Sequence, residues 1–252
     1  MGNLPIGEGA NLLTGQAKKG GITLMNVLSA AVKAGRSALN EYEAKLFLAG
    51  FGVPVSREIY VADDAAAIKA AGEIGFPVVL KAAGEKIQHK TELGAVALNL
   101  KSEAEIRGEA RRLLAIAGCE GLLVQEMVRG ERELVCGLTR DARFGPCVMF
   151  GLGGIFTEVL DDAVFRVAPL TTNDALEMMA EIRAAKILQA FRSQAPVDRA
   201  ALARIIVAVG EIGSRHDDVR EIDINPLKIR PDGTPVAVDA LVTLRAASTV
   251  GE

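Results

Sequence analysis

The residues best suited to chemistry lie near the C-terminus, in a segment that we expect to form a hairpin. Its first arm has the sequence EIDINPL at 221–227, and its second arm has VAVD at 236–239. In a strand Asp223 and Asn225 share one face, and a turn at the intervening PDG sequence places Asn225 opposite Asp239. Carboxylate and amide oxygens suit Mg²⁺, whereas zinc would call for His or Cys. The hairpin therefore predicts a magnesium site; the alternative is an ordinary hairpin whose polar residues face solvent.

A lysine interrupts an earlier candidate strand. Lys81 stands near the end of the apolar run VVLKA at 78–82. Its aliphatic stem can pack while its ammonium group reaches into a cleft and meets phosphate oxygens. The alternative is a strand lysine that extends to solvent and binds nothing.

The loop after that strand carries a histidine among polar residues. The sequence GEKIQHKT at 84–91 is close to the phosphate loop GxxxxGK[ST], but His89 replaces its second glycine, so we do not read it as a P-loop. His89 is either a surface residue or an imidazole that acts as base, nucleophile or phosphoryl acceptor. We expect the second histidine, His216, in an exposed loop. A glycine loop at 151–154 either presents N–H groups to an anion or is a plain turn.

Apolar periodicity and capping residues predict the elements that must position these side chains. We expect helices at 41–50, 63–74 and 102–117 and from 171 and 198, strands at 55–61, 78–82, 95–100, 122–127, 133–139 and 147–150 and near 159 and 167, and a hairpin at 220–242. Two blocks, 40–125 and 126–245, predict an α+β (mixed α/β) fold with a cleft between two lobes. Residues 1–38, weakly helical, are expected to be an extension outside the main core.

The composition of the 252 residues excludes several classes of protein. Hydrophobic residues make up 50%, but none of their runs approaches the ~20 residues needed to span a bilayer, so we expect a soluble globular protein without a membrane partner. The net charge is −3 without charged runs, which argues against a nucleic-acid surface. Three cysteines without CxxC spacing argue against a disulfide framework or a zinc site and favour the reducing cytoplasm.

Taken in order, these motifs resemble the ATP-grasp domain of the nucleoside-diphosphate-forming acyl-CoA synthetases, the family of ADP-forming acetate–CoA ligase and, more distantly, succinyl-CoA synthetase. The resemblance covers about residues 40–245. The motifs are VLKA at 79–82, HKTELG at 89–94, VQEM at 124–127, GEREL at 130–134, FGLGG at 150–154, and DINPL at 223–227 with Asp239. Ala95 departs from the pattern, because the family often has a second glycine there. The resemblance implies an ATP-grasp fold with ATP or ADP in the cleft between the lobes.

The resemblance also implies a set of nucleotide-binding residues. These are Lys81, Gln125, Glu126, Met127, Glu133, Gly153 and Gly154. Lys81 would hold the α- and β-phosphates, the backbone of 125–127 would pair with adenine, and Glu133 would lie near the ribose.

Metal and catalytic roles follow from the same resemblance. Asn225 and Asp239 would bind Mg²⁺. Asp223 occupies the place of a carboxylate close to the phosphohistidine that visits the nucleotide site. His89 would relay the phosphoryl group between ATP and a histidine of a partner.

The implied activity is acid + CoA + ATP ⇌ acyl-CoA + ADP + phosphate, with a small carboxylic acid as substrate. The chain has no GxGxxG Rossmann unit, so we expect a hetero-oligomer with a CoA-binding, α-type subunit that carries a phosphorylatable histidine. The opening Met1 favours a separate β-type subunit over a piece of a fused enzyme. Two alternatives stay open. A free-standing ATP-grasp ligase that joins a carboxylate to an amine would not need His89, and a non-catalytic ATP-sensing module would need no phosphoryl acceptor.

Overall fold

The computed structural model describes residues 27–84, 87, 93–154, 162–190 and 193–245. These residues form two compact units: unit 1 contains residues 57–127, and unit 2 contains residues 27–56 and 128–245. Within the described ranges, no helix combines the length and the apolar character that crossing a membrane requires.

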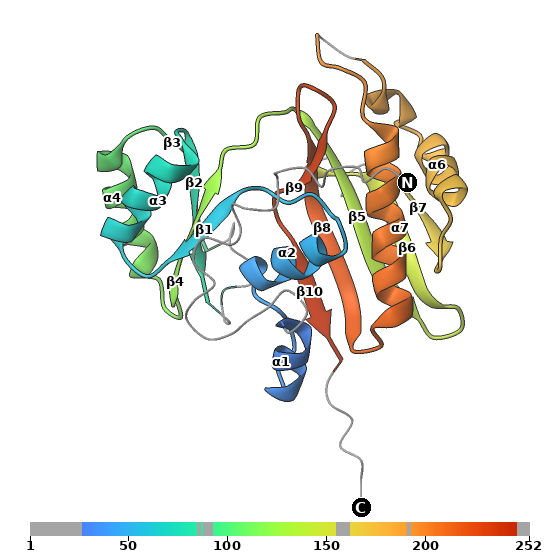
Figure 1. Cartoon of the computed structure of the whole chain (residues 1–252), viewed down its shortest axis with the longest axis horizontal. Coiled ribbons are helices and arrows are strands. Elements are labelled where there is room, and N and C mark those ends of the chain that lie inside the picture. The colour runs from blue at the N-terminus through green and yellow to red at the C-terminus, as the bar shows by residue number, and fades with distance from the viewer. Residues whose placement is uncertain (1–26, 85–86, 88–92, 155–161, 191–192, 246–252) are drawn as a thin grey trace, which may run out of the picture. The chain divides into compact units, whose positions relative to one another are not determined.

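Unit 1 is a four-stranded antiparallel sheet in the order β1-β4-β2-β3, with two helices (Figure 1). The strands are β1 Glu58–Val61, β2 Val78–Ala83, β3 Val96–Leu100 and β4 Gly121–Glu126, and the helices are α3 Asp64–Ile74 and α4 Glu103–Leu114. Alternate strand residues such as Leu80 and Val124 pack with Ala67 and Ile106 of the helices. One face of the sheet is therefore covered by both helices.

Local capping explains where these helices begin. The side chain of Asp63 accepts the N–H of Ala66 at 2.7 Å, and Ser102 accepts the N–H of Glu105 at 3.3 Å. Each cap satisfies one of the donors that the first turn of a helix leaves without a partner. The two helices were predicted to start at 63 and 102, and this agreement arises because a cap is a local interaction.

Unit 2 contains a larger sheet in the order β10-β8-β5-β6-β7, with β9 paired to β8 (Figure 1). The strands are β5 Arg132–Asp141, β6 Gly145–Leu152, β7 Ala163–Val167, β8 Val219–Ile229, β9 Pro235–Ala237 and β10 Leu241–Leu244. The helices are α1 Val27–Lys33, α2 Glu41–Gly50, α6 Thr172–Glu181 and α7 Arg199–Arg215, and η3 Ala185–Leu188 is a 3₁₀ helix.

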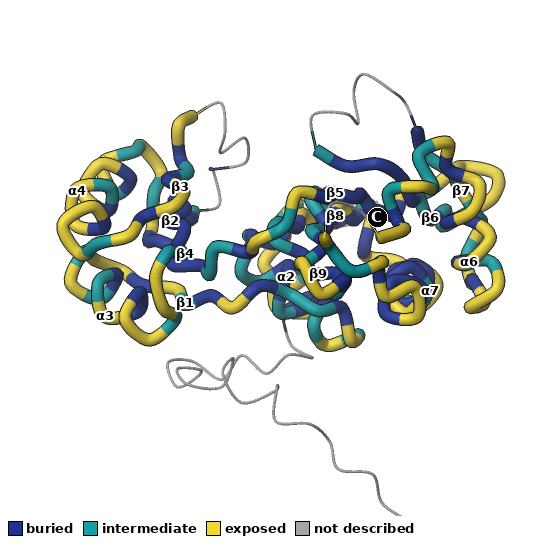
Figure 2. The backbone as a smooth tube through the Cα atoms, turned by 90° about the horizontal axis from the view of Figure 1, so that it is seen from above, coloured by how far each residue is buried: buried dark blue, intermediate teal, exposed yellow. Residues whose placement is uncertain are grey.

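Helix α7 packs closely on this sheet and has a buried side (Figure 2). A Cβ added to Gly213 would lie 2.6 Å from Cδ1 of Leu138, and one added to Gly210 would lie 2.9 Å from Cδ1 of Leu170. These distances are too short for real carbon contacts, so the two glycines allow the helix to approach its neighbours. Ile222 and Ile224 of β8 belong to the resulting core, whereas Asp223 lies between them on the opposite face of the strand.

Residues 27–38 belong to unit 2, and three of them, Val27, Leu28 and Ala31, pack in its core, which corrects the expectation of an extension outside it. The buried face of α1 belongs to the unit 2 core. After α1 the chain runs beside β10, where the N–H of Leu244 donates to the carbonyl of Ser37 at 2.7 Å. The apolar spacing of this short helix is therefore a packing pattern. Residues 1–26 lie outside the described residues.

The two units divide the chain differently from the expected lobes. The end of the expected strand 55–61 forms β1 in unit 1, whereas Val55 makes an isolated bridge to Ala237 in unit 2. Helix α2, which we assigned to the first lobe, also belongs to unit 2. The second division falls after Met127. Val55 and Ala237 are far apart in the sequence, so a local pattern does not reveal their pairing.

Candidate functional site

The final hairpin places positions 225 and 239 opposite each other. In strand β8, Leu227 lies opposite Ala237 of β9, and Asp223 lies opposite Leu241 of β10. Both pairs have the same register, which puts position 225 opposite position 239. Between these two ladders the N–H of Val238 donates to the carbonyl oxygen of Pro226 at 3.3 Å. The hairpin register predicted from the sequence is therefore confirmed.

A β-bulge in β8 contains Asn225. In the pairing with β5 the register shifts between Leu134 and Cys136, so that Asn225 and Pro226 together oppose one residue of β5. Proline has no N–H to donate to a ladder and is tolerated at bulges. Bulges also redirect side chains beside functional sites. The ladder is therefore interrupted at the position that we predict to bind a metal ion.

The donors at this position suit a magnesium ion. Asn225 and Asp239 are half-buried, and both lie outside the hydrophobic core. Oδ1 of Asp239 accepts the N–H of Ala240 at 2.9 Å, which orients the carboxylate. Among the described residues, three or more His, Cys, Asp or Glu side chains never come together in the way that a site built from such ligands would require. An amide oxygen and one or two carboxylates match Mg²⁺, which keeps several waters and phosphate ligands.

Asp223 lies on the same strand as Asn225 and interacts with Asp239. Its pKa is raised above the ordinary 3.8, first by desolvation and then by the negative charge of Asp239. Its side chain is exposed, so this desolvation reflects nearby protein and not complete enclosure. Two carboxylates that disfavour each other's charge are both stabilised when a cation binds near them.

Glu133 and the glycine loop form a second cluster in unit 2. Lys228 opposes Glu133 in the β5–β8 pairing, and its Nζ lies 3.2 Å from Oε1 of Glu133. The N–H of Gly153 donates to the carbonyl of Glu133 at 2.9 Å. A Cβ on Gly154 would collide with the side chain of Glu133, so glycine allows the close approach. Lys228 has no signal in the local sequence, because its pairing with Glu133 joins distant segments.

Lys81 lies on the sheet face of unit 1 that is turned away from the helices, among other buried polar side chains. Lys81 is 6% exposed, Gln125 is 2% exposed and Glu58 is 6% exposed. Gln125 pairs with Glu58 on one side and with Val79 on the other, and Lys81 follows Val79 by one strand repeat on the same face. Lys81 therefore does not extend to solvent. Burial of Glu58 was not expected from the sequence, because an isolated strand carboxylate is usually exposed.

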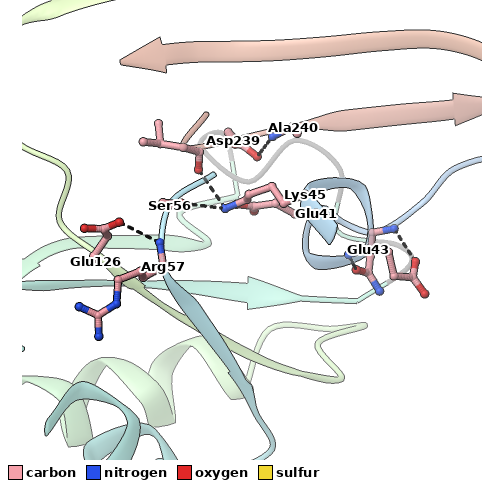
Figure 3. A network of polar contacts seen from close by, with 10 residues as sticks. Glu41, Glu43, Lys45, Ser56, Arg57, Glu126, Asp239 and Ala240 are labelled. Atoms are coloured by element: carbon pink, nitrogen blue, oxygen red, sulfur yellow. Dashed lines mark hydrogen bonds and ion pairs between the residues drawn. The ribbon is translucent and has the colours of Figure 1, made fainter. Parts of the chain in front are cut away.

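The end of β4 is tied to the segment before β1. The N–H of Glu126 donates to the carbonyl of Arg57 at 2.9 Å, and the N–H of Arg57 donates to Oε1 of Glu126 at 2.8 Å (Figure 3). The N–H of Met127 donates to the carbonyl of Pro77 at 3.3 Å. An adenine would therefore compete with these acceptors for the N–H groups of residues 126 and 127.

Of the two histidines, the structure describes only His216. His89 lies outside the described residues. His216, expected in an exposed loop, ends α7, and its ring packs edge-on against Phe47 at 5.6 Å and Phe51 at 5.5 Å between centroids. Burial lowers the pKa of His216 below its ordinary 6.5. His216 does lie in the loop after α7, as expected, but it is half-buried and not exposed, because two phenylalanines from a distant helix and its C-cap pack against its ring.

Within unit 2 the structure brings Asp223, Asn225 and Asp239 together on the hairpin, and it brings Glu133 together with the glycine loop. Within unit 1, Lys81 and Gln125 share one face of the sheet. The predicted residues thus form local groups, each held by the strands of one unit.

Known proteins resemble the chain along most of its length. The model of the ATP-grasp domain family matches residues 30–244. Acetate–CoA ligase (ADP-forming) I subunit beta of Pyrococcus furiosus is 43% identical over 219 residues, which cover 84% of this chain and 94% of that subunit. Acetate–CoA ligase (ADP-forming) II of Archaeoglobus fulgidus is 39% identical, and the match covers 79% of this chain but 29% of that longer protein.

A solved structure has a similar fold. It is the selenomethionine form of dinucleotide forming acetyl-coenzyme A synthetase 1 from Ca. Korarchaeum cryptofilum. The TM-score is 0.78 at 41% identity, covering 88% of this chain and 100% of that chain. That protein is in complex with coenzyme A and Mg-AMPPCP, with its phosphohistidine segment pointing towards the nucleotide binding site. The predicted ATP-grasp fold and its α+β class are confirmed.

Proposed function

The chain belongs to the ATP-grasp domain family, and on that premise we propose that it is the ATP-binding, β-type subunit of an ADP-forming acyl-CoA synthetase. The reaction is acid + CoA + ATP ⇌ acyl-CoA + ADP + phosphate. The observation that carries the proposal is the extent of the match, which spans 94% of a relative named subunit beta and 29% of a longer relative. We further propose that a partner subunit, the α-type chain of a hetero-oligomer, binds CoA.

The nucleotide contacts are assigned within each unit. In unit 1, Lys81 supplies a positive charge to the α- and β-phosphates, and the backbone of 125–127 binds adenine. In unit 2, Glu133 accepts a ribose hydroxyl, and its pairing with Lys228 supports the orientation of the carboxylate. Gly153 and Gly154 let the backbone of the glycine loop approach the phosphates, and the N–H of Gly153 would exchange the carbonyl of Glu133 for a phosphate oxygen. Phosphoryl transfer requires charge neutralisation and positioning, and these groups provide both.

Asn225 and Asp239 are assigned as the ligands of Mg²⁺. The bound ion would neutralise phosphate charge during transfer. Asp223 is assigned to the histidine that enters the site: its carboxylate accepts the N–H of one ring nitrogen and leaves the other nitrogen with a lone pair. This role needs an ionised Asp223, which a cation near Asp239 favours.

His89 is assigned as the phosphoryl relay. A ring nitrogen of neutral His89 attacks the γ-phosphorus of ATP, the N–P bond forms, and the bond between the γ-phosphorus and the bridging oxygen breaks to release ADP. The phosphoryl group then passes from His89 to the histidine of the partner subunit. A neutral imidazole is available near pH 7, and covalent capture limits loss of the group to water.

A labelling experiment tests this function. The chain is mixed with a CoA-binding partner subunit and ATP labelled in the γ-phosphate, and phosphohistidine is detected on each subunit by mass spectrometry. We expect label on the partner with the unmodified chain, and the His89→Ala variant should bind nucleotide but deliver no label. His216→Gln is the matched control, because His216 packs against aromatic rings at the end of α7, and it should deliver label normally.

Two results would contradict the assignment. Normal delivery of label by His89→Ala would remove His89 from the relay. If the unmodified chain left every histidine of the partner unlabelled, the subunit function itself would be contradicted.

A further inference from the structure

A buried ion pair in α2 reaches the residue that precedes Asp239. Lys45 and Glu41 are one turn apart in α2, and Nζ of Lys45 lies 2.9 Å from Oε1 of Glu41. Their side chains are 1% and 2% exposed, respectively. Pairs at this spacing usually lie on the solvent face of a helix and contribute little to stability. This pair is fully enclosed, so it needs another explanation.

Stability alone does not explain Lys45 and Glu41. Removal of two charges from water is unfavourable, and an apolar pair of similar volume often stabilises a core equally well or better. A buried ammonium group does offer something that an apolar side chain lacks, since its N–H donors can hold specific oxygen atoms in place. The contacts of Lys45 therefore indicate its role.

The ammonium group of Lys45 holds the backbone beside Asp239. Its Nζ donates to the carbonyl oxygen of Val238 at 3.1 Å and to Oγ of Ser56 at 3.4 Å (Figure 3). The carbonyl of Val238 belongs to the peptide bond whose nitrogen is that of Asp239. The N–H of Val238 donates to the carbonyl of Pro226, in the bulge of β8. Contacts on two sides therefore hold Val238, and its carbonyl contact restricts the backbone at the start of Asp239.

Neighbouring backbone contacts complete this frame. The N–H of Ser56 donates to the carbonyl of Ala237 at 3.0 Å, and the N–H of Ala237 donates to the carbonyl of Pro54 at 2.9 Å. Residues 238–240 are not part of a strand, because they lie in the interruption between β9 and β10. Lys45 thus supports a segment that the sheet ladder itself does not hold.

We propose that the Lys45–Glu41 pair positions Asp239 to bind the metal ion. This inference rests on the proposed function, because it takes Asp239 as a metal ligand. Lys45 is a positioning residue, since it acts through the backbone of Val238. Glu41 has a part of its own: it neutralises the ammonium group, so that the support places no uncompensated positive charge near a bound cation.

The test removes both charges together. Lys45→Met alone would leave Glu41 buried without its cation and destabilise the fold, so the informative variant is Lys45→Met/Glu41→Gln. Calorimetry measures the affinity of the full chain for AMPPCP with magnesium and with EDTA, and the ratio of the two affinities is the magnesium coupling. We expect the coupling to fall about tenfold, which is within the range typical when a group that supports a metal ligand is lost. The affinity measured in EDTA should stay within about twofold of the value for the unmodified chain.

A matched control separates positioning from general destabilisation. Arg140, also in unit 2, donates to the carbonyls of Val219, Gly213 and His216. Arg140→Met should lower the melting temperature but leave the magnesium coupling unchanged. An equal loss of coupling in Arg140→Met would overturn the proposal, because any destabilised variant would then show the effect.

The Asp239→Asn variant separates this inference from the metal assignment. If Lys45 acts through Asp239, the paired change in α2 should cause no further loss of coupling when Asp239→Asn is already present. A folded Lys45→Met/Glu41→Gln variant with normal coupling would overturn the positioning role while leaving Asp239 as a ligand. Normal coupling in Asp239→Asn itself would refute the metal assignment, and the positioning role with it.

Discussion

Asp239 is half-buried and is not itself part of the hydrophobic core. Its carboxylate accepts the N–H of Ala240, and the peptide before it is held through Val238 by Pro226 and Lys45. Loss of the carboxylate should therefore affect metal binding much more than folding. The same reasoning applies to Asn225, which is half-buried at the bulge.

We predict that Asn225→Ala and Asp239→Ala each weaken the dependence of turnover on magnesium. Loss of an oxygen ligand should raise the magnesium concentration needed for half-maximal turnover by about tenfold or more, with the far-ultraviolet circular dichroism spectrum unchanged. Magnesium titrations of turnover with the partner subunit present would measure this. Asp217→Ala is the control, because Asp217 is 91% exposed and lies 3.6 Å from Arg140. Normal magnesium dependence in both ligand variants would refute the assignment.

Part of this site could be predicted from local sequence. The strand alternation and the PDG turn were sufficient to place position 225 opposite position 239. Glu58, Lys228 and Lys45 could not be found in this way. Each owes its position to pairing or packing between distant segments, and by residue type each would be expected on the surface.

At the scale of elements, α2 contributes to two separate features of unit 2. Its first turns carry the Lys45–Glu41 pair, and its last turn and C-cap carry Phe47 and Phe51 against His216 at the end of α7. The aromatic cluster therefore joins the ends of two helices. Protonation of His216 would place a charge among these rings.

We predict that His216 contributes to stability in a pH-dependent way. Its folded-state pKa is lowered from 6.5, mainly by desolvation and also by Arg215, while Asp218 acts in the opposite direction. The unfolded chain therefore binds a proton more readily, so the contribution is complete above pH 6.5 and is lost as the pH falls through 6.5 toward the folded-state pKa. The melting temperature should fall less between about pH 7.5 and pH 5.5 in His216→Gln than in the unmodified chain. An identical fall would contradict this role.

The elements that were predicted well have local signals. The helix at 41–50 was predicted with its observed bounds, and Asn40 caps it through a box with Glu43. The N-caps Asp63 and Ser102 were likewise visible in the sequence. The placement of α1 was missed, because it packs against α2 in a core that is built largely from elements much later in the chain.

At the scale of the whole molecule, the order of the motifs was more informative than any single motif. Resemblance to the ATP-grasp domain predicted the fold, and the match over residues 30–244 confirms it. The sequence did not reveal which segments of the chain form each unit. Residues 27–56 join residues 128–245 through contacts between distant segments, such as that of Val55 with Ala237. Local periodicity contains no information about such long-range pairing.

The central claim is that this chain makes acyl-CoA only together with a CoA-binding partner. The most direct test supplies ATP, magnesium, CoA and a small carboxylic acid to the chain alone, to the partner alone and to both, and measures ADP and acyl-CoA. We predict equal amounts of both products from the mixture over many turnovers. The partner alone should give neither product, and the chain alone should give no acyl-CoA and at most one ADP per chain, left by phosphorylation of His89. Continued ADP release by the chain alone, over many turnovers and only when an amine is added with the acid, would contradict this account and identify a free-standing ligase. Tight binding of ATP without ADP release, whatever partner and acid are supplied, would contradict it in favour of a sensing module.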